Sequence, residues 1–147
     1  MTFAKSFKAT AFTALIVSTL MSAPALAGGS TAIVEQWGWG NGAGVGQTGY
    51  HNRTRVFQDG WGNSSLTTQD GAFNRTVVGQ SGHHNAADTS QNGANNIAGV
   101  AQFGGHNTAS TEQNGNNNGV GVIQVGNGND ASTTQNGSGN VVLIIQD

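Results

Sequence analysis

The 147-residue sequence lacks cysteine, and its only two lysines, Lys5 and Lys8, lie near its start. Without cysteine, the fold must hold together without disulfide bonds. Large aliphatic residues are scarce, whereas Gly, Asn, Thr and Ser dominate, which excludes a conventional globule with a thick aliphatic core and places a free chain close to disorder. After residue 27, three arginines stand against seven acidic residues, a net charge of −4. This leaves no basic patch for nucleic acid.

Residues 1–27 form a segment of a different kind. Lys5 and Lys8 precede an apolar run from Ala9 to about Met21, and residues 24–27 end in the small-x-small pattern that a signal peptidase reads. The run is too short to span a bilayer comfortably. A buried helix is the alternative interpretation. We predict a secretory signal peptide over residues 1–27 and an exported mature chain over residues 28–147 with no membrane span.

The rest of the chain repeats a unit of eleven residues, in which Gln is followed at +2 by Gly and at +5 by Asn. This register indicates a repeat architecture. The glutamines are Gln36, Gln47, Gln58, Gln69, Gln80, Gln91, Gln102, Gln113, Gln124, Gln135 and Gln146. The glycines are Gly38, Gly49, Gly60, Gly71, Gly82, Gly93, Gly104, Gly115, Gly126 and Gly137. The asparagines are Asn41, Asn52, Asn63, Asn74, Asn85, Asn96, Asn107, Asn118, Asn129 and Asn140.

Each unit is predicted to consist of a short strand and a tight turn. Counted from Asn, positions +2, +4 and +6 lie on one side of an extended strand, because side chains alternate. These positions hold small or β-branched residues and then Gln, as in Thr54, Val56 and Gln58. Four residues separate Gln from the next Asn, and the second is always Gly, which is typical of a turn that needs a positive φ.

A second period, two units long, indicates which strands are neighbours. Position +4 alternates between two residue types from one unit to the next. In every second unit it is Val, except in the last, where it is Ile144; in the units between, it is Thr, except in the first, where it is Val45. If each strand pairs with the strand two units away, equivalent side chains stack in columns of nearly one residue type. In a simple meander, where each strand pairs with the next one, nothing in the structure would explain the alternation. The sequence therefore predicts an all-β fold, a two-sheet parallel β-solenoid with two units, or twenty-two residues, per rung and five and a half rungs. Successive rungs would lie about 4.8 Å apart and the facing sheets about 10 Å apart.

The repeated amides have a structural role in such a fold. Buried Gln and Asn side chains are costly unless their donors and acceptors are paired. At the strand spacing, each amide can donate to the amide above it and accept from the amide below it. We predict four structural amide ladders, two of Gln and two of Asn. Solvated polar residues beside the turns are the alternative.

The unit Ser30-x5-Gln36-x-Gly38-x2-Asn41-x-Ala43-x3-Gln47 resembles the curlin repeat, and residues 74–91 and 96–113 repeat it with Asn in the Ser position. The resemblance covers essentially the whole mature chain. It implies a secreted structural subunit of curli, the functional amyloid fibres of bacterial surfaces and biofilm matrix, with cross-β order in the polymer. It implies a role in adhesion and surface attachment, without enzymatic activity or a cofactor. The implied partners are further copies of the chain, a nucleator subunit, an outer-membrane export pore and accessory chaperones.

Two other functions compete with a major fibre subunit. Near-perfect repeats are less typical of a minor, nucleating curli subunit than of a major one. A monomeric solenoid adhesin needs the same rungs and capped ends, and the absence of a cap in the sequence favours polymerisation. Curlins usually carry a glycine-rich targeting segment before the first repeat, where this chain has only Gly28 and Gly29.

Aromatic residues and histidines recur at the turns. Trp39, Trp61 and His83 recur at intervals of two units, as do His84 and His106, so each set is predicted to stack. No cysteine or carboxylate completes a ligand shell around the histidines, so we predict no metal site. We predict no catalytic residues either.

The last predicted strand, residues 141–146, is apolar on both sides. Val142 and Ile144 are predicted to face inward, and Val141, Leu143 and Ile145 to face outward. The segment has high β-propensity and no charge before Asp147, a composition that seeds cross-β pairing. It also leaves its rung incomplete, with an open sheet edge. We predict that it forms the subunit junction, with a plain hydrophobic cap as the alternative.

Overall fold

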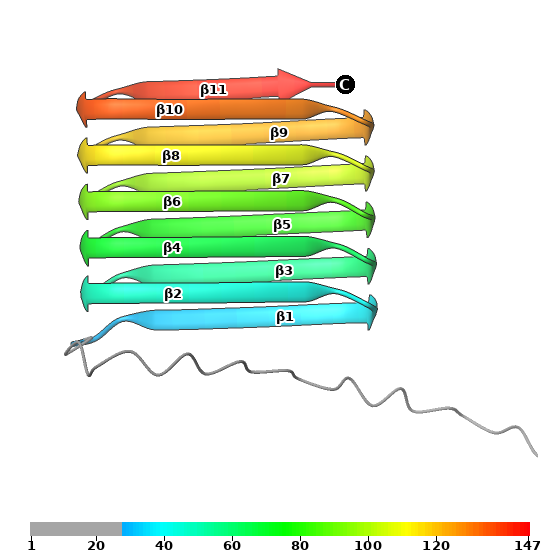
Figure 1. The fold of residues 1–147 in the computed structure, drawn as a ribbon, viewed down its shortest axis with the longest axis horizontal. Coiled ribbons are helices and arrows are strands. Elements are labelled where there is room, and N and C mark those ends of the chain that lie inside the picture. The colour runs from blue at the N-terminus through cyan, green and yellow to red at the C-terminus, as the bar shows by residue number, and fades with distance from the viewer. Residues whose placement is uncertain (1–27) are drawn as a thin grey trace, which may run out of the picture.

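The computed structural model describes residues 28–147, which form two layers of stacked strands (Figure 1). The predicted signal peptide lies outside these described residues. The strands are β1 (Thr31–Trp39), β2 (Gly42–Tyr50), β3 (Arg53–Trp61), β4 (Ser64–Ala72), β5 (Arg75–His83), β6 (Ala86–Ala94), β7 (Ile97–Gly105), β8 (Thr108–Asn116), β9 (Gly119–Asn127), β10 (Asp130–Ser138) and β11 (Val141–Gln146). Within residues 28–147, no helix is long and apolar enough to cross a membrane.

The strands alternate between two sheets. The odd sheet contains β1-β3-β5-β7-β9-β11 in that order, and the even sheet contains β2-β4-β6-β8-β10. All pairs are parallel, and each residue pairs with its equivalent two units later, as Val56 does with Val78. Gln58 and Gln80, for example, are 22 residues apart and lie in successive rungs. These pairings confirm the two-sheet parallel β-solenoid and its predicted rung of two units.

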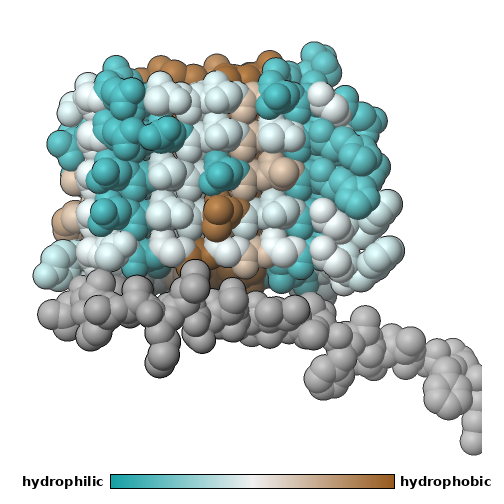
Figure 2. Space-filling model, viewed as in Figure 1, coloured by the Kyte–Doolittle hydropathy of each residue, from teal (hydrophilic) through white to brown (hydrophobic). Residues whose placement is uncertain are grey.

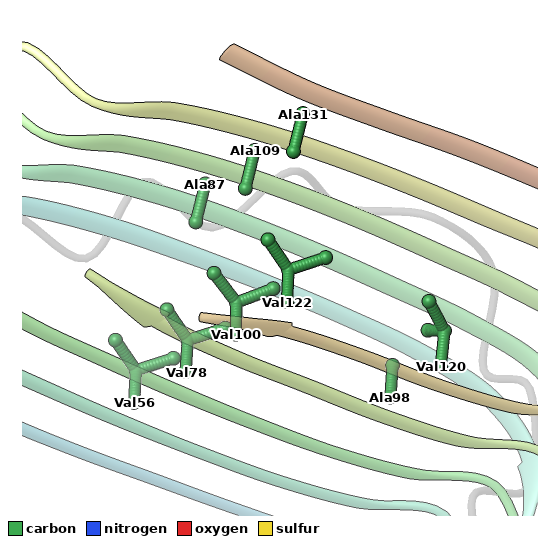
Figure 3. Packing of buried hydrophobic residues seen from close by; sticks show 9 residues of the cluster. All are labelled: Val56, Val78, Ala87, Ala98, Val100, Ala109, Val120, Val122 and Ala131. Atoms are coloured by element: carbon green, nitrogen blue, oxygen red, sulfur yellow. The ribbon is translucent and has the colours of Figure 1, made fainter. Parts of the chain in front are cut away.

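The core between the sheets is narrow and holds small side chains. Its buried hydrophobic residues are Val56, Val78, Ala87, Ala98, Val100, Ala109, Val120, Val122 and Ala131. Figure 3 shows a row of valines in the odd sheet and a row of alanines in the even sheet. The largest fully buried side chains are seven glutamines, from Gln58 to Gln124. Small aliphatic columns flanked by amides therefore replace the aliphatic core of an ordinary globule.

The turns are shorter than the sequence predicts. Each of the first ten strands continues for three residues past its glutamine, so only two residues, such as His84 and Asn85, separate successive strands. The predicted four-residue turn is wrong in extent, because the repeated glycine lies within the strand. The positive φ predicted at this glycine is confirmed, with a value of 119° at Gly82.

A second position with positive φ lies directly before each repeated asparagine. It is filled by glycine in some repeats, and by larger residues such as Phe73 (φ 58°) and His84 (φ 53°) in others. These values fall in the left-handed region, which is uncommon for residues with a side chain. The sequence analysis missed this position because no single residue type occupies it.

Candidate assembly site

Two columns of glutamine run through the solenoid, one on each sheet. In the odd sheet, Gln58 Nε2 lies 2.7 Å from Gln80 Oε1, and Gln80 Nε2 lies 2.8 Å from Gln102 Oε1. Each of these Nε2 groups also donates to a backbone carbonyl of the facing sheet, as Gln58 does to Gly42 at 3.0 Å. Both amide hydrogens therefore have acceptors in the interior of the stack.

The direction of these bonds is the same throughout. The odd column donates upward through Gln36, Gln58, Gln80, Gln102, Gln124 and Gln146. The even column donates upward through Gln47, Gln69, Gln91, Gln113 and Gln135. In every bond between two glutamines, Nε2 therefore points toward the C-terminal end of the solenoid, and Oε1 accepts from the N-terminal side.

The asparagines make different bonds from the amide-to-amide ladder that the sequence predicts. In the interior, Asn74 Oδ1 accepts the backbone N–H of Asn96 at 3.0 Å, and Asn74 Nδ2 donates to Gly93 O at 2.9 Å. Direct side-chain bonds between the repeated asparagines occur in three places within residues 28–147. The asparagines therefore mainly join each turn to the backbone of the next rung, again with the donor amide pointing toward the C-terminal end.

The repeated glycines are required by the spacing of the rungs. A Cβ atom added to Gly82 would collide with the carbonyl oxygen of Gly104 in the next rung. The same carbonyl accepts a hydrogen bond from Asn85 Nδ2 at 3.0 Å. Each glycine therefore combines a positive φ with a close backbone approach that no side chain permits.

The C-terminal end of the solenoid carries amide donors without an acceptor in a following rung. Gln135 and Gln146 each donate Nε2 to one carbonyl of the facing sheet and to no further glutamine within residues 28–147. Asn129 and Asn140 donate Nδ2 to carbonyls four residues earlier, in their own turns. Asn140 Nδ2 also donates to Asn118 Oδ1 in the preceding rung. Four donors of the repeating pattern thus lack a partner in a following rung at this end.

The N-terminal end carries the matching acceptors. Within residues 28–147, Gln36 Oε1 and Gln47 Oε1 accept no amide from a preceding glutamine, and the carbonyls of Gly38 and Gly49 accept none from a preceding asparagine. In every later rung the equivalent oxygens accept these bonds. The two ends are therefore complementary in number, chemical type and position.

The strand β11 exposes apolar side chains at the C-terminal end. Val141, Leu143 and Ile145 are 81%, 64% and 66% exposed. Val142 and Ile144 pack against the core, as the sequence predicts. Brown, apolar atoms line the upper edge of the molecule in Figure 2, where Figure 1 places β11.

Aromatic and histidine side chains stack along one edge. Ring centroids lie 5.6 Å apart for Trp39 and Trp61, 5.4 Å for Trp61 and His83, and 5.2 Å for His84 and His106. In the part of the chain that the structure describes, no group of three or more His, Cys, Asp or Glu residues could hold a metal ion. The stacked rings therefore support the rungs by packing.

Comparison with known families identifies the repeat. Residues 82–115 match the family model of the curlin associated repeat. No curated protein matches the chain. The matched segment contains three of the repeated glutamines, and the same spacing continues from Gln36 to Gln146. Residues 82–115 therefore contain a curlin associated repeat, and the repeats of the chain form a β-solenoid.

Proposed function

We propose that the chain is a structural subunit of an extracellular, curli-type amyloid fibre, which grows by head-to-tail stacking of solenoids. The observation that carries this proposal is the complementarity of the two ends. Four amide donors at the C-terminal end have the spacing of the four oxygen acceptors at the N-terminal end. Each of these donors already has one acceptor in its own solenoid. Joining the ends adds the partner in a following rung that the same column has in the interior, and each such hydrogen bond contributes about 0.5–1.5 kcal/mol.

The uniform direction of the glutamine bonds favours an open filament over a closed dimer. Two C-terminal ends would face donor to donor, and two N-terminal ends would face acceptor to acceptor. Only a C-terminal end against an N-terminal end pairs every group. A contact between two different surfaces of the same molecule generates a filament when its rotation does not close a ring.

The match of residues 82–115 to the curlin associated repeat supports the biological setting of the proposal. The chain is exported after removal of residues 1–27, crosses the outer membrane through a dedicated pore with accessory chaperones, and assembles on a nucleator subunit. The fibres then serve in biofilm matrix, adhesion and surface attachment. The regular columns in all rungs favour a major subunit over a nucleator, and the two unpaired ends favour a fibre over a monomeric adhesin.

The proposal is tested with the purified chain of residues 28–147, which contains every strand described. We expect a disordered spectrum by circular dichroism when the protein is fresh, followed by thioflavin-binding fibrils. Their diffraction should show reflections near 4.8 Å and about 10 Å, the strand and sheet spacings of cross-β structure. A monomer that persists for weeks at high concentration would overturn the proposal.

A matched variant tests whether the end donors matter. Replacing Gln135 and Gln146 with Glu retains an acceptor for Gln113 and Gln124 below them. The variant lacks the end donors and sets a carboxylate against the acceptors of the next copy. We expect a longer lag and slower elongation than for the parent chain. Equal assembly of both chains would contradict joining through these glutamines.

A further inference from the structure

We infer that successive subunits of the fibre are related by a half-turn about the fibre axis. In this arrangement, β1 of one copy continues the even sheet of the preceding copy, and β2 continues its odd sheet. The inference rests on the proposed head-to-tail fibre and adds which strand meets which at the junction.

The number of strands carries the inference. The last strand of the even sheet is β10 and the last strand of the odd sheet is β11, so the next vacant position lies on β10. If β1 of a second copy were placed on β11 instead, β2 would lie two strand positions above β10. Two positions are about 9.6 Å, because neighbouring strands lie about 4.8 Å apart. No hydrogen bond between Gln135 and the second copy's Gln47 spans that distance.

Placing β1 on β10 leaves no strand position vacant. Gln135 Nε2 then meets Oε1 of Gln36, and Gln146 Nε2 meets Oε1 of Gln47 in the second copy. All four columns continue with the spacing that they have inside one solenoid. Because β1 belongs to the odd sheet of its own copy, the second copy must be turned by half a revolution.

Residues 28–30 already have the geometry of the second half of a turn. Gly29 has a φ of 73°, close to the 70° of Gly40 at the equivalent position before Asn41. Ser30 Oγ accepts the backbone N–H of Asn52 at 3.1 Å, the bond that asparagine Oδ1 makes in later rungs. The chain therefore enters β1 as if a strand preceded it in the even sheet. In the half-turn arrangement, β11 of the preceding copy occupies that position.

Two side chains of β2 match β11 in this arrangement. Val45 is the exception in a column that otherwise holds threonine, and the half-turn places it on Ile144 of the valine column. On the outer face, a Cβ added to Gly121 would lie 3.1 Å from Leu143 Cδ1, so the leucine lies along a glycine. The half-turn places Gly44 on the other side of Leu143. The leucine then lies between two glycines.

The charges on the two outer faces are also unequal. The even sheet exposes four acidic residues and no arginine: Asp70, Asp88, Glu112 and Asp130. The odd sheet carries all three arginines, Arg53, Arg55 and Arg75, with Glu35 and Asp59. Stacking without rotation would align the acidic faces of all subunits along one side of the fibre. The half-turn alternates the acidic and the arginine-bearing faces, which lowers the repulsion between neighbouring subunits.

Engineered disulfides can distinguish the two arrangements, because the chain has no cysteine of its own. In the half-turn arrangement, Gly46 of one copy lies beside Ile145 of the preceding copy. In the arrangement without rotation, Glu35 takes the place of Gly46 beside Ile145. Neighbouring strands place Cα atoms within the range that a disulfide bridges. A side chain at Gly46 meets no atom within 4 Å. The paired positions lie at opposite ends of one solenoid, so neither pair can close within a subunit (Figure 1).

Fibrils of Gly46→Cys/Ile145→Cys and of Glu35→Cys/Ile145→Cys are oxidised, dissolved without reductant and separated by size. We expect a ladder of covalent multimers from the first variant and monomers from the second. A ladder from the second variant alone, or from neither variant, would overturn the half-turn while the fibre remains. Absence of fibrils from the parent chain would overturn the proposed function and this inference together.

Electron cryo-microscopy of the parent fibre provides a measurement without any variant. The half-turn predicts a rotation of about 180° between subunits and a rise of five and a half rungs, about 26 Å, since each rung rises about 4.8 Å. Stacking without rotation predicts a rise of six rungs, about 29 Å. The second result would contradict the inference even if the cysteine variants failed to assemble.

Discussion

Thr76 Oγ1 donates a hydrogen bond across the core to Gln91 Oε1 at 2.9 Å, whereas the equally buried Thr89 hydroxyl has no partner within residues 28–147. The two threonines therefore predict opposite outcomes for the same substitution. Thr76→Val should destabilise the fibre by about 1 kcal/mol per subunit, because it removes a net favourable bond. Thr89→Val should be neutral or stabilising, because it removes a buried hydroxyl without a partner. The guanidinium concentration that dissolves half of the fibrils measures both, and equal shifts would contradict the assignment.

Interior glutamines should matter more for assembly than outward amides. Gln80→Ala removes the acceptor of Gln58 and the donor to Gln102, leaving partners unpaired at about 1–3 kcal/mol each. Asn92→Ala removes an exposed amide from the outer face and should change little. Thioflavin kinetics at equal concentration compare the two variants. Equal lag times would show that the buried glutamine column does not drive assembly.

Gly137→Ala should produce a subunit that stops growth. Within its own solenoid, a Cβ at Gly137 meets no atom closer than Asn140 Nδ2 at 3.8 Å. In the fibre, the carbonyl of the next subunit's Gly38 would collide with it. We expect the variant to add to the C-terminal end of parent seeds through its intact N-terminal end and then block further addition.

The control for this prediction is Gly82→Ala, which has similar strain, with a φ of 119° against 104° at Gly137. Its collision with Gly104 lies inside its own solenoid, so it should neither fold nor cap the fibre. Growth of parent seeds is measured with a small fraction of either variant present. Unchanged growth with Gly137→Ala would show that no rung stacks on β10.

The exposed face of β11 should promote assembly. Leu143→Lys with Ile145→Lys should lengthen the lag and weaken subunit joining, because a charged outer face opposes lateral contact. Deletion of residues 141–147 should also lengthen the lag and weaken subunit joining. The remaining rungs can still fold, because they retain their own strand pairings. The matched control places Lys at Leu66 and Thr68, which hold the same positions on the interior strand β4 and are also exposed. If all of these chains polymerise at the parent rate, β11 is not the subunit junction.

The spacing of Gln36 to Gln146 was sufficient to predict the strands, their inward faces and the pairing of strands two units apart. This succeeded because side chains alternate along a strand and each stacked column keeps one residue type. The short turns could not be predicted, because Gly82 bends the strand without ending it. The asparagine bonds could not be predicted either, because their partners are backbone groups such as Gly93 O, which leave no mark on residue identity.

The sequence also could not predict that the buried threonine hydroxyls of the even sheet lack hydrogen-bond partners within residues 28–147. Thr67, Thr89, Thr111 and Thr133 have the same residue type and spacing as a bonded column, yet their hydroxyls have no partners within residues 28–147. Whether a buried hydroxyl reaches an acceptor depends on the facing sheet. In the odd sheet, Thr54 and Thr76 reach a glutamine across the core, because their position on the strand differs.

The pairing interval of one rung has a consequence for how a subunit joins a growing fibre. Every strand pairs with the strand one rung before or after it in the sequence, so each pairing closes only a short loop. A disordered chain that first lays β1 on the C-terminal end can add its remaining strands in sequence order, each onto a strand already in place. At the opposite end, β11 must be placed first and the order reversed. The two ends therefore offer different templates, and a fibre should elongate at unequal rates at its two tips.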